Sequence, residues 1–217
     1  TNEAEARKVV DEITAKGRKA LALALDVGDS ASFAGFADTL RRELPRVFGR
    51  SQFDHLVNNA GIAGHAPLAE TSEALFDELM RVHLKGPLFL TQALLPLLRD
   101  GGRIVNISTG LARFSLPGYG AYAAMKGAVE VLTRYLAKEL GPRGIAVNTL
   151  APGAIETDFG GGAVRDNKDL NKMVASMTAL GRVGLPEDVG GALAMLLAPE
   201  NRWITGQRIE VSGGMFL

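Results

Sequence analysis

Hydrophobic positions along the chain alternate between short apolar runs and longer segments with a helical period. Apolar side chains recur every three or four residues over 2–15, and Lys16 and Gly17 follow, so the pattern predicts a surface helix that ends there. The run 20–25, ALALAL, predicts a buried strand. Residues 30–44 then predict an amphipathic helix with Ser30 as its N-cap.

The same alternation continues to the end of the chain. It predicts strands at 53–61, 101–108, 145–153 and 207–214, separated by helices at 74–98, 118–144 and 186–198. Apolar strands linked by helices of this length indicate a parallel sheet that is covered on both faces. The predicted fold class is therefore α/β, a doubly wound parallel sheet in three layers (α/β/α), formed by a single domain over residues 1–217.

Composition narrows the classes of function. The 24 Lys and Arg residues equal the 24 Asp and Glu residues in number, without a basic stripe or an acidic run, so neither nucleic acid nor a membrane is an expected partner. The absence of cysteine excludes disulfides and thiolate chemistry, and His55, His65 and His83 lack metal-ligand spacing. No apolar run is long enough to span a bilayer, and the charged first residues do not form a signal peptide. We expect a cytoplasmic protein with a small-molecule substrate and no metal.

Unusual residues follow the predicted strands, where doubly wound sheets bind their ligands: after Asp26, Asn58, Ser108 and Leu150. Tyr122 and Lys126 are four residues apart near the start of a helix, so both side chains lie on one face. A nearby ammonium favours the phenolate, which would lower a tyrosine pKa from about 10 toward neutrality and suit it to exchange a proton with an alcohol. Such a pair also occurs by chance on helix surfaces, so its context is decisive.

Four further motifs supply that context: NNAG at 58–61, NIST at 106–109, PGAIETD at 152–158 and GQRIEVSGG at 206–214. In this order and spacing, and with Tyr122 and Lys126, they resemble the short-chain dehydrogenase/reductase family, classical type, throughout the chain. The resemblance implies a Rossmann-like fold. It also implies an NAD(P)-dependent oxidoreductase that transfers a hydride between nicotinamide and a carbonyl or secondary alcohol.

The resemblance assigns catalytic roles to individual positions. It implies that Tyr122 is the acid/base and that Lys126 lowers the pKa of Tyr122 and binds the nicotinamide ribose. Thr109, thirteen residues before Tyr122, stands where the family has a serine that polarises the carbonyl, with Ser108 as the alternative. His83 replaces an asparagine that holds a water in the proton relay, and its ring either joins this relay or only packs there.

The resemblance also implies a binding surface for NADP or NAD, with family habit favouring NADP. Besides Tyr122 and Lys126, the implied contacts are Asp26 and Val27 at the adenine, Asn59, Ala60 and Gly61 along the middle, and Pro152, Gly153, Ile155 and Thr157 at the nicotinamide end. Residues 159–179 resemble the variable substrate loop, either a mobile lid or a plain surface excursion. His65 either faces the substrate or belongs to a solvated loop, and His55 is expected to be structural.

The glycine-rich turn with which the family binds the cofactor pyrophosphate does not precede Asp26. We therefore expect the sequence to lack an N-terminal segment with the first two strands, which would leave strand edges unpaired and weaken cofactor binding. A non-catalytic scaffold or binding member of the same fold is the alternative. A sugar-nucleotide epimerase or dehydratase fits less well, because no added substrate domain follows VSGGMFL. Family habit also implies a homo-oligomer, dimer or tetramer, paired through helices at 88–98 and 128–140.

Overall fold

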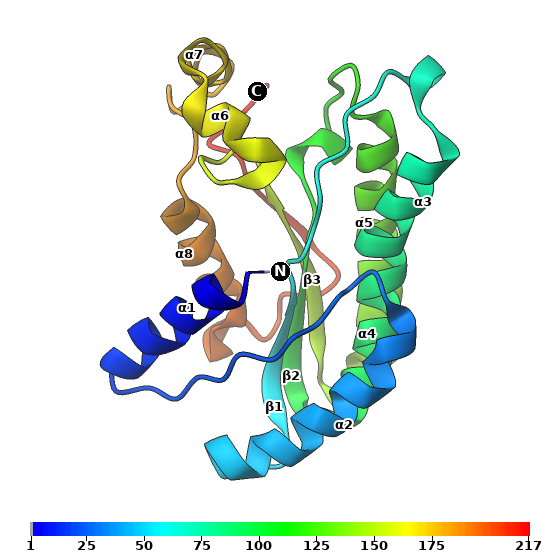
Figure 1. Ribbon diagram of the computed structural model, residues 1–217, viewed down its shortest axis with the longest axis vertical. Coiled ribbons are helices and arrows are strands. Elements are labelled where there is room, and N and C mark those ends of the chain that lie inside the picture. The colour runs from blue at the N-terminus through cyan, green and yellow to red at the C-terminus, as the bar shows by residue number, and fades with distance from the viewer. Residues whose placement is uncertain (1) are drawn as a thin grey trace.

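A computed structural model describes residues 2–217, in which four parallel strands form one sheet. Its order is β1 (Phe53–Asn58), β2 (Leu98–Ile107), β3 (Ala146–Pro152) and β4 (Arg208–Val211). Figure 1 shows helices on both sides of this sheet, with α2 (Phe33–Glu43), α4 (Gly86–Leu94) and α5 (Gly120–Leu140) on one side and α8 (Pro186–Leu197) on the other. The predicted doubly wound α/β class is confirmed.

The core forms on both faces of β2. Ile104 and its neighbours pack against α5 through Leu136 and Leu140, whereas Val105 on the opposite face packs against Leu196 of α8. Ile104 and Val105 are 0% and 1% exposed. Adjacent strand residues point to opposite faces, so burial of both requires helices on both sides.

The run ALALAL is not a strand, which corrects the prediction from its pattern. The segment from 18 to 26 pairs with no strand, and its leucines are at most half-buried. A cavity of about 380 Å³ lies between Leu25 and Val27 on one side and Phe53, Leu56 and Val57 of β1 on the other. Among the described residues β1 pairs with β2 alone, so the backbone groups along its outer edge have no strand beside them, and this segment does not come close enough to pair there.

Helix starts follow local capping chemistry. Asn2 caps α1 (Glu3–Ala15) by accepting bonds from the amides of Ala4 and Glu5. Ser30 is not the N-cap that its position suggested, because Asp29 accepts the bond from Ala31 and caps a short 3₁₀ turn, Ser30–Ser32, before α2.

Within residues 2–217 no helix has both the length and the apolar character to cross a bilayer.

The helix predicted at 74–98 is one helical path with a change of pitch at its centre. It consists of α3 (Glu73–Met80), the π-helical turn η4 (Arg81–Lys85), α4 and a 3₁₀ turn, Leu95–Leu97, and it ends there because Leu98 already belongs to β2. Pro87 cannot donate an amide bond, and a wider turn precedes it. Gly86 at this junction lies so near the segment after ALALAL that an added Cβ would come within 2.4 Å of the Val27 carbonyl oxygen.

Replacing Gly86 with alanine is therefore expected to destabilise the fold by about 1–3 kcal/mol, because a backbone atom must move to admit the methyl group. Denaturant unfolding measures the loss. Gly35 in α2 is a matched control, since nothing lies within 4 Å of its added Cβ, and alanine there should stabilise by up to about 1 kcal/mol. Equal effects of the two substitutions would contradict the expected close approach.

Candidate active site

The carboxyl ends of β1 and β2 meet the first turns of α5 and the turn η4. Tyr122 and Lys126 project from α5 one turn apart, and Thr109 follows β2 directly. His83 comes from η4, and its ring lies edge-on to Tyr122 with 5.2 Å between ring centroids. An added Cβ at Gly61 would approach both His83 and Lys126, so the loop after β1 also reaches this point. Residues from four separate segments converge here.

Tyr122 is almost completely enclosed, with 7% of its surface exposed. Burial raises the pKa of its phenol to about 12, and a hydrogen bond with the Thr109 side chain opposes this rise only in part. Desolvation of the phenolate is the largest cause, and it outweighs the opposing effect of Thr109. Tyr122 is an acid that keeps its proton at neutral pH.

Lys126 is equally buried, and it pairs with no carboxylate within residues 2–217. Its Nζ donates to the carbonyl oxygen of Ile107 at 2.7 Å and lies 5.8 Å from the centroid of the Tyr122 ring. Burial lowers the pKa of the Lys126 ammonium to about 8. A largely protonated, desolvated ammonium beside a phenol is suited to stabilise negative charge on that phenol.

The two neighbouring hydroxyls at the end of β2 face different surroundings. The Thr109 side chain lies close enough to Tyr122 to act on the pKa of its phenol, and the Thr109 hydroxyl accepts the amide of Leu111 at 3.3 Å. Ser108 donates to Oε1 of Glu130 at 2.6 Å and is 3% exposed. Thr109 therefore lies with Tyr122, whereas Ser108 is directed elsewhere.

His83 is 1% exposed and anchored at one nitrogen. Its Nε2 lies 2.9 Å from the carbonyl oxygen of Ile62 and 3.3 Å from the amide nitrogen of the same residue. The shorter contact favours a proton on Nε2 and leaves Nδ1 as an acceptor. Nδ1 is buried and has no partner among the described residues, and it lies 3.5 Å from an added Cβ at Gly61. A buried acceptor without a donor marks a place where a hydroxyl or a water molecule fits.

Burial, and next the charge of Lys126, lowers the pKa of His83 from 6.5 to about 4. Between these values an unfolded chain binds a proton that the folded chain rejects, so stability should fall as the pH decreases from about 6.5 to about 4. The variant His83→Gln should not show this loss of stability between about pH 6.5 and pH 4. Urea unfolding of both proteins at several pH values measures the difference. The same slope in both proteins would contradict a buried neutral imidazole.

The residues expected to contact a cofactor lie along the same edge of the sheet. Asn59, Ala60 and Gly61 are exposed after β1. The neighbouring residue Asn58 instead points into the fold, where its Nδ2 donates to the Thr91 hydroxyl at 3.1 Å and to Oδ1 of Asn106 at 2.8 Å. Three features lie close together here: a glycine backbone at Gly61, the His83 Nδ1 acceptor without a donor among the described residues, and the buried Lys126 ammonium. Together they fit a ligand with sugar hydroxyls, such as a dinucleotide.

The other implied contacts lie at the two ends of this edge. Asp26 accepts the amide of Gly28 at 2.8 Å, and Val27 is half-buried beside the cavity. Beyond β3, Gly153 donates to the carbonyl of Val211, and Thr157 accepts the amide of Phe159. Ile155 packs against Gly184, to which its backbone also bridges. Pro152 is the last residue of β3 and pairs with Val211.

Residues 159–179 form a helical excursion above the carboxyl end of the sheet (Figure 1). It contains a 3₁₀ turn, Phe159–Gly162, then α6 (Ala163–Asp166) and α7 (Lys168–Ser176). Gly160, Gly161 and Gly162 all have positive φ, so this chain path requires glycine. The excursion brings the ring of Phe159 to 6.2 Å from that of Tyr122.

The remaining histidines lie outside this centre. His65 packs edge-on against Tyr119 with 4.9 Å between ring centroids, and His55 lines the cavity beside β1. Within residues 2–217 no group of three or more acidic, His or Cys side chains is arranged to hold a metal ion.

Sequence patterns alone did not indicate four charged residues beneath the site: Arg113, Glu130, Arg208 and Glu210. Glu130 follows Lys126 by one helical turn, and Arg208 and Glu210 share a face of β4, so both spacings were a usable signal. Their ion pairs link α5 to β4.

Known proteins resemble this chain over nearly its whole length. Residues 1–216 match a family model described as enoyl-(acyl carrier protein) reductase. The dehydrogenase OXI1 of Cochliobolus heterostrophus is 36% identical over 223 residues, which cover 100% of this chain and 94% of that relative.

Solved structures agree with this family. LugOII, described as a promiscuous reductase that catalyses keto-reduction at C1 during lugdunomycin biosynthesis, is 36% identical with a TM-score of 0.93, and the match covers 100% of this chain and 85% of that one. The angucycline C-6 ketoreductase LanV with bound NADP is 32% identical with a TM-score of 0.90, covering 97% and 80%. The chain described here belongs to the short-chain dehydrogenase/reductase family and is an NAD(P)-dependent oxidoreductase.

Proposed function

We propose that this enzyme reduces a ketone to a secondary alcohol with NADPH, and that Tyr122 is the proton donor. The observation that supports this most strongly is the convergence of a protonated Tyr122, the Lys126 ammonium and the Thr109 hydroxyl at one point. A phenol whose pKa is raised to about 12 by burial holds its proton at neutral pH, which suits the reductive direction.

Each of the three side chains has a distinct task in this proposal. Thr109 donates a hydrogen bond to the substrate carbonyl oxygen and so polarises the bond. Tyr122 gives its phenolic proton to that oxygen as negative charge develops there. Lys126 stabilises the phenolate that remains, and His83 Nδ1 accepts a bond from a water or a ribose hydroxyl nearby. The bound nicotinamide supplies the hydride.

The cofactor proposal rests on the exposed edge of the sheet. Asn59, Ala60 and Gly61 line the middle of the dinucleotide, and Pro152, Gly153, Ile155 and Thr157 lie at its nicotinamide end, with Asp26 and Val27 at the adenine end. We favour NADP over NAD because two similar proteins were solved with this cofactor. LanV has NADP bound, and a blue fluorescent protein that is 36% identical to this chain is in complex with NADPH. Lys126 also contacts the ribose.

For the substrate we propose a polycyclic aromatic ketone, admitted beneath residues 159–179 as a lid. LugOII acts in lugdunomycin biosynthesis and LanV is an angucycline ketoreductase. The aromatic rings of Phe159, close to Tyr122, and of Tyr119, packed by His65, support a planar apolar substrate.

We further propose a single domain over residues 1–217 that works in the cytoplasm as a homo-oligomer, dimer or tetramer. The absence of cysteine suits a reducing compartment. Phe89 on α4 and Val131 on α5 are 40% and 44% exposed, which supports pairing through these helices. Light scattering would give the oligomeric state, and a monomer would refute the pairing.

The reaction is tested by following reduced-nicotinamide absorbance with NADPH or NADH and two aromatic carbonyl probes, 1-tetralone and 9,10-phenanthrenequinone. The expected result is turnover with a preference for NADPH, and mass spectrometry should identify the secondary alcohol from 1-tetralone and the hydroquinone from 9,10-phenanthrenequinone. Cofactor binding without turnover of any carbonyl would favour a non-catalytic binding member of the fold.

A further inference from the structure

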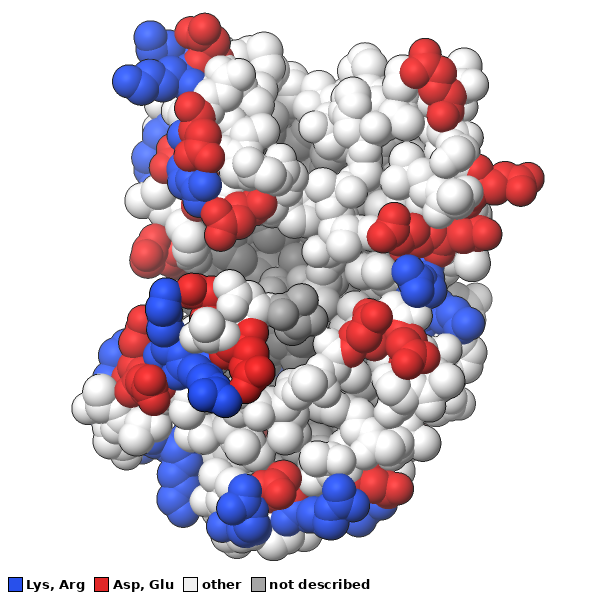
Figure 2. Space-filling view, in the orientation of Figure 1, with Lys and Arg blue, Asp and Glu red and all other residues white. Residues whose placement is uncertain are grey.

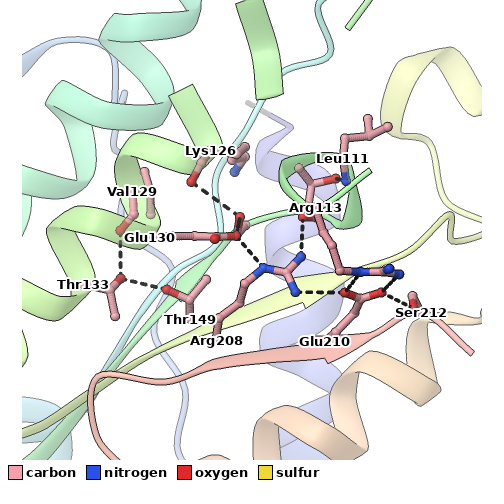
Figure 3. A network of polar contacts seen from close by, with 12 residues as sticks. Leu111, Arg113, Lys126, Val129, Glu130, Thr133, Thr149, Arg208, Glu210 and Ser212 are labelled. Atoms are coloured by element: carbon pink, nitrogen blue, oxygen red, sulfur yellow. Dashed lines mark hydrogen bonds and ion pairs between the residues drawn. The ribbon is translucent and has the colours of Figure 1, made fainter. Parts of the chain in front are cut away.

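A network of charged side chains ties the end of β2 to α5 and β4 (Figure 3). Arg208 binds Glu130 through Nε and Glu210 through Nη1, each at 2.8 Å. Arg113 binds the two oxygens of Glu210 at 2.6 and 2.7 Å. Two arginines thus balance two glutamates, and Arg208, whose side chain is 24% exposed, lies between the carboxylates.

Three consecutive residues at the end of β2 are each held by a different side chain. The Ile107 carbonyl accepts from Lys126, and the Ser108 hydroxyl donates to Glu130. The Thr109 carbonyl accepts from Nη2 of Arg208 at 3.1 Å. The network therefore acts directly on the residue whose hydroxyl meets Tyr122.

Because of the backbone conformation of Thr109, the contact at its carbonyl oxygen also affects where its side chain lies. Thr109 is extended, with φ −158° and ψ 153°, so the directions of its carbonyl and of its Cβ are fixed relative to each other through one Cα. Successive side chains of an extended chain point to opposite sides. Holding Ser108 on the Glu130 side thus directs Thr109 to the other side, toward Tyr122.

We propose that Arg208, held by Glu130 and Glu210, is a positioning residue that keeps the Thr109 hydroxyl in the active site and the Ser108 hydroxyl out of it. This rests on the proposed role of Thr109. Only a planar guanidinium presents enough fixed donors to reach two carboxylates and a carbonyl at once. The hydrogen bond from Arg113, the largest cause, keeps the pKa of Glu210 at about 2, so this carboxylate stays charged at neutral pH.

A double-mutant cycle between Arg208 and Thr109 tests the proposal, with NADPH and 9,10-phenanthrenequinone as probes. Arg208→Met should lower kcat about 10- to 100-fold, as expected for a misplaced catalytic group, with KM for the quinone nearly unchanged. In the Thr109→Val background the same change should cause almost no further loss, because the hydroxyl it positions is gone. Equal losses of kcat in both backgrounds would overturn the proposal.

Two variants separate positioning from general stability. Arg143 also joins a carboxylate, Asp100, to backbone carbonyls, those of Leu95 and Leu98, but toward the other end of β2. Arg143→Met should lower the melting temperature while kcat stays at the wild-type value. Arg208→Lys keeps a cation between the carboxylates, so it should fold and lose part of kcat; wild-type kcat in this variant would also overturn the proposal.

The outcomes also distinguish this proposal from the proposed function. If wild-type protein fails to reduce the quinone, or if Tyr122→Phe keeps full turnover, the assignment of the site is wrong. If Tyr122→Phe is inactive but the losses of kcat caused by Arg208→Met and Thr109→Val multiply in the double variant, the assignment of the site stands. Only the positioning role of Arg208 is then wrong.

Discussion

Replacing Tyr122 with phenylalanine should lower kcat for ketone reduction by about 100- to 10,000-fold, the usual contribution of a positioned general acid. The phenol hydroxyl is the proton donor in the proposed reaction and lies near the Thr109 side chain, while its ring packs edge-on to His83. The ring remains in the variant, so packing should be preserved and NADPH affinity should change little. Steady-state kinetics and a fluorescence titration with NADPH measure both quantities.

Tyr135→Phe is a matched control for this substitution. Tyr135 lies on the same helix, α5, but is 65% exposed. Loss of its hydroxyl should leave kcat unchanged. Comparable activity of Tyr122→Phe and Tyr135→Phe would show that another group donates the proton.

Replacing Lys126 with methionine should abolish most activity and yet stabilise the protein without cofactor. Lys126 is 5% exposed, and within residues 2–217 its Nζ has one hydrogen-bond partner, the Ile107 carbonyl. At neutral pH the described fold thus carries a desolvated ammonium with no carboxylate beside it. Methionine fills a similar volume without that charge. We expect kcat to fall about 100-fold or more and the free energy of unfolding to rise by on the order of 1–3 kcal/mol.

The pH dependence of stability gives this prediction a second test. The pKa of Lys126 falls from 10.5 to about 8 on folding, so between these values the folded chain binds fewer protons than the unfolded one. Wild-type stability should therefore rise with pH over this interval, and Lys126→Met should lack the rise. Lys138→Met, an exposed position on the same helix, should behave as wild type. A less stable Lys126→Met protein at neutral pH would contradict the unpaired buried charge.

The sequence by itself determined the fold class and most elements. Apolar runs predicted β1 to β4, of which β2 and β3 are largely buried and β1 and β4 mostly half-buried, and helical periodicity predicted α2, α5 and α8. The spacing of Tyr122 and Lys126 placed both on one face of α5, since that spacing is fixed by the helix itself. Order and spacing of the motifs were also sufficient to indicate the family, which the family model and the relatives confirm.

Tertiary structure decided what depends on partners far apart in the chain. ALALAL has the pattern of a strand, but a strand forms only beside another, and the cavity next to β1 separates them. The pKa of Tyr122 rises because residues from several elements exclude water from its phenol, an effect that the i, i+4 spacing does not contain. Likewise, Ser108 and Thr109 are adjacent and chemically alike, and only Glu130 and Arg208, brought in by α5 and β4, direct one hydroxyl away from Tyr122 and leave the other beside it. Local periodicity is set by backbone geometry, whereas desolvation and ion pairing are set by which distant residues folding brings together.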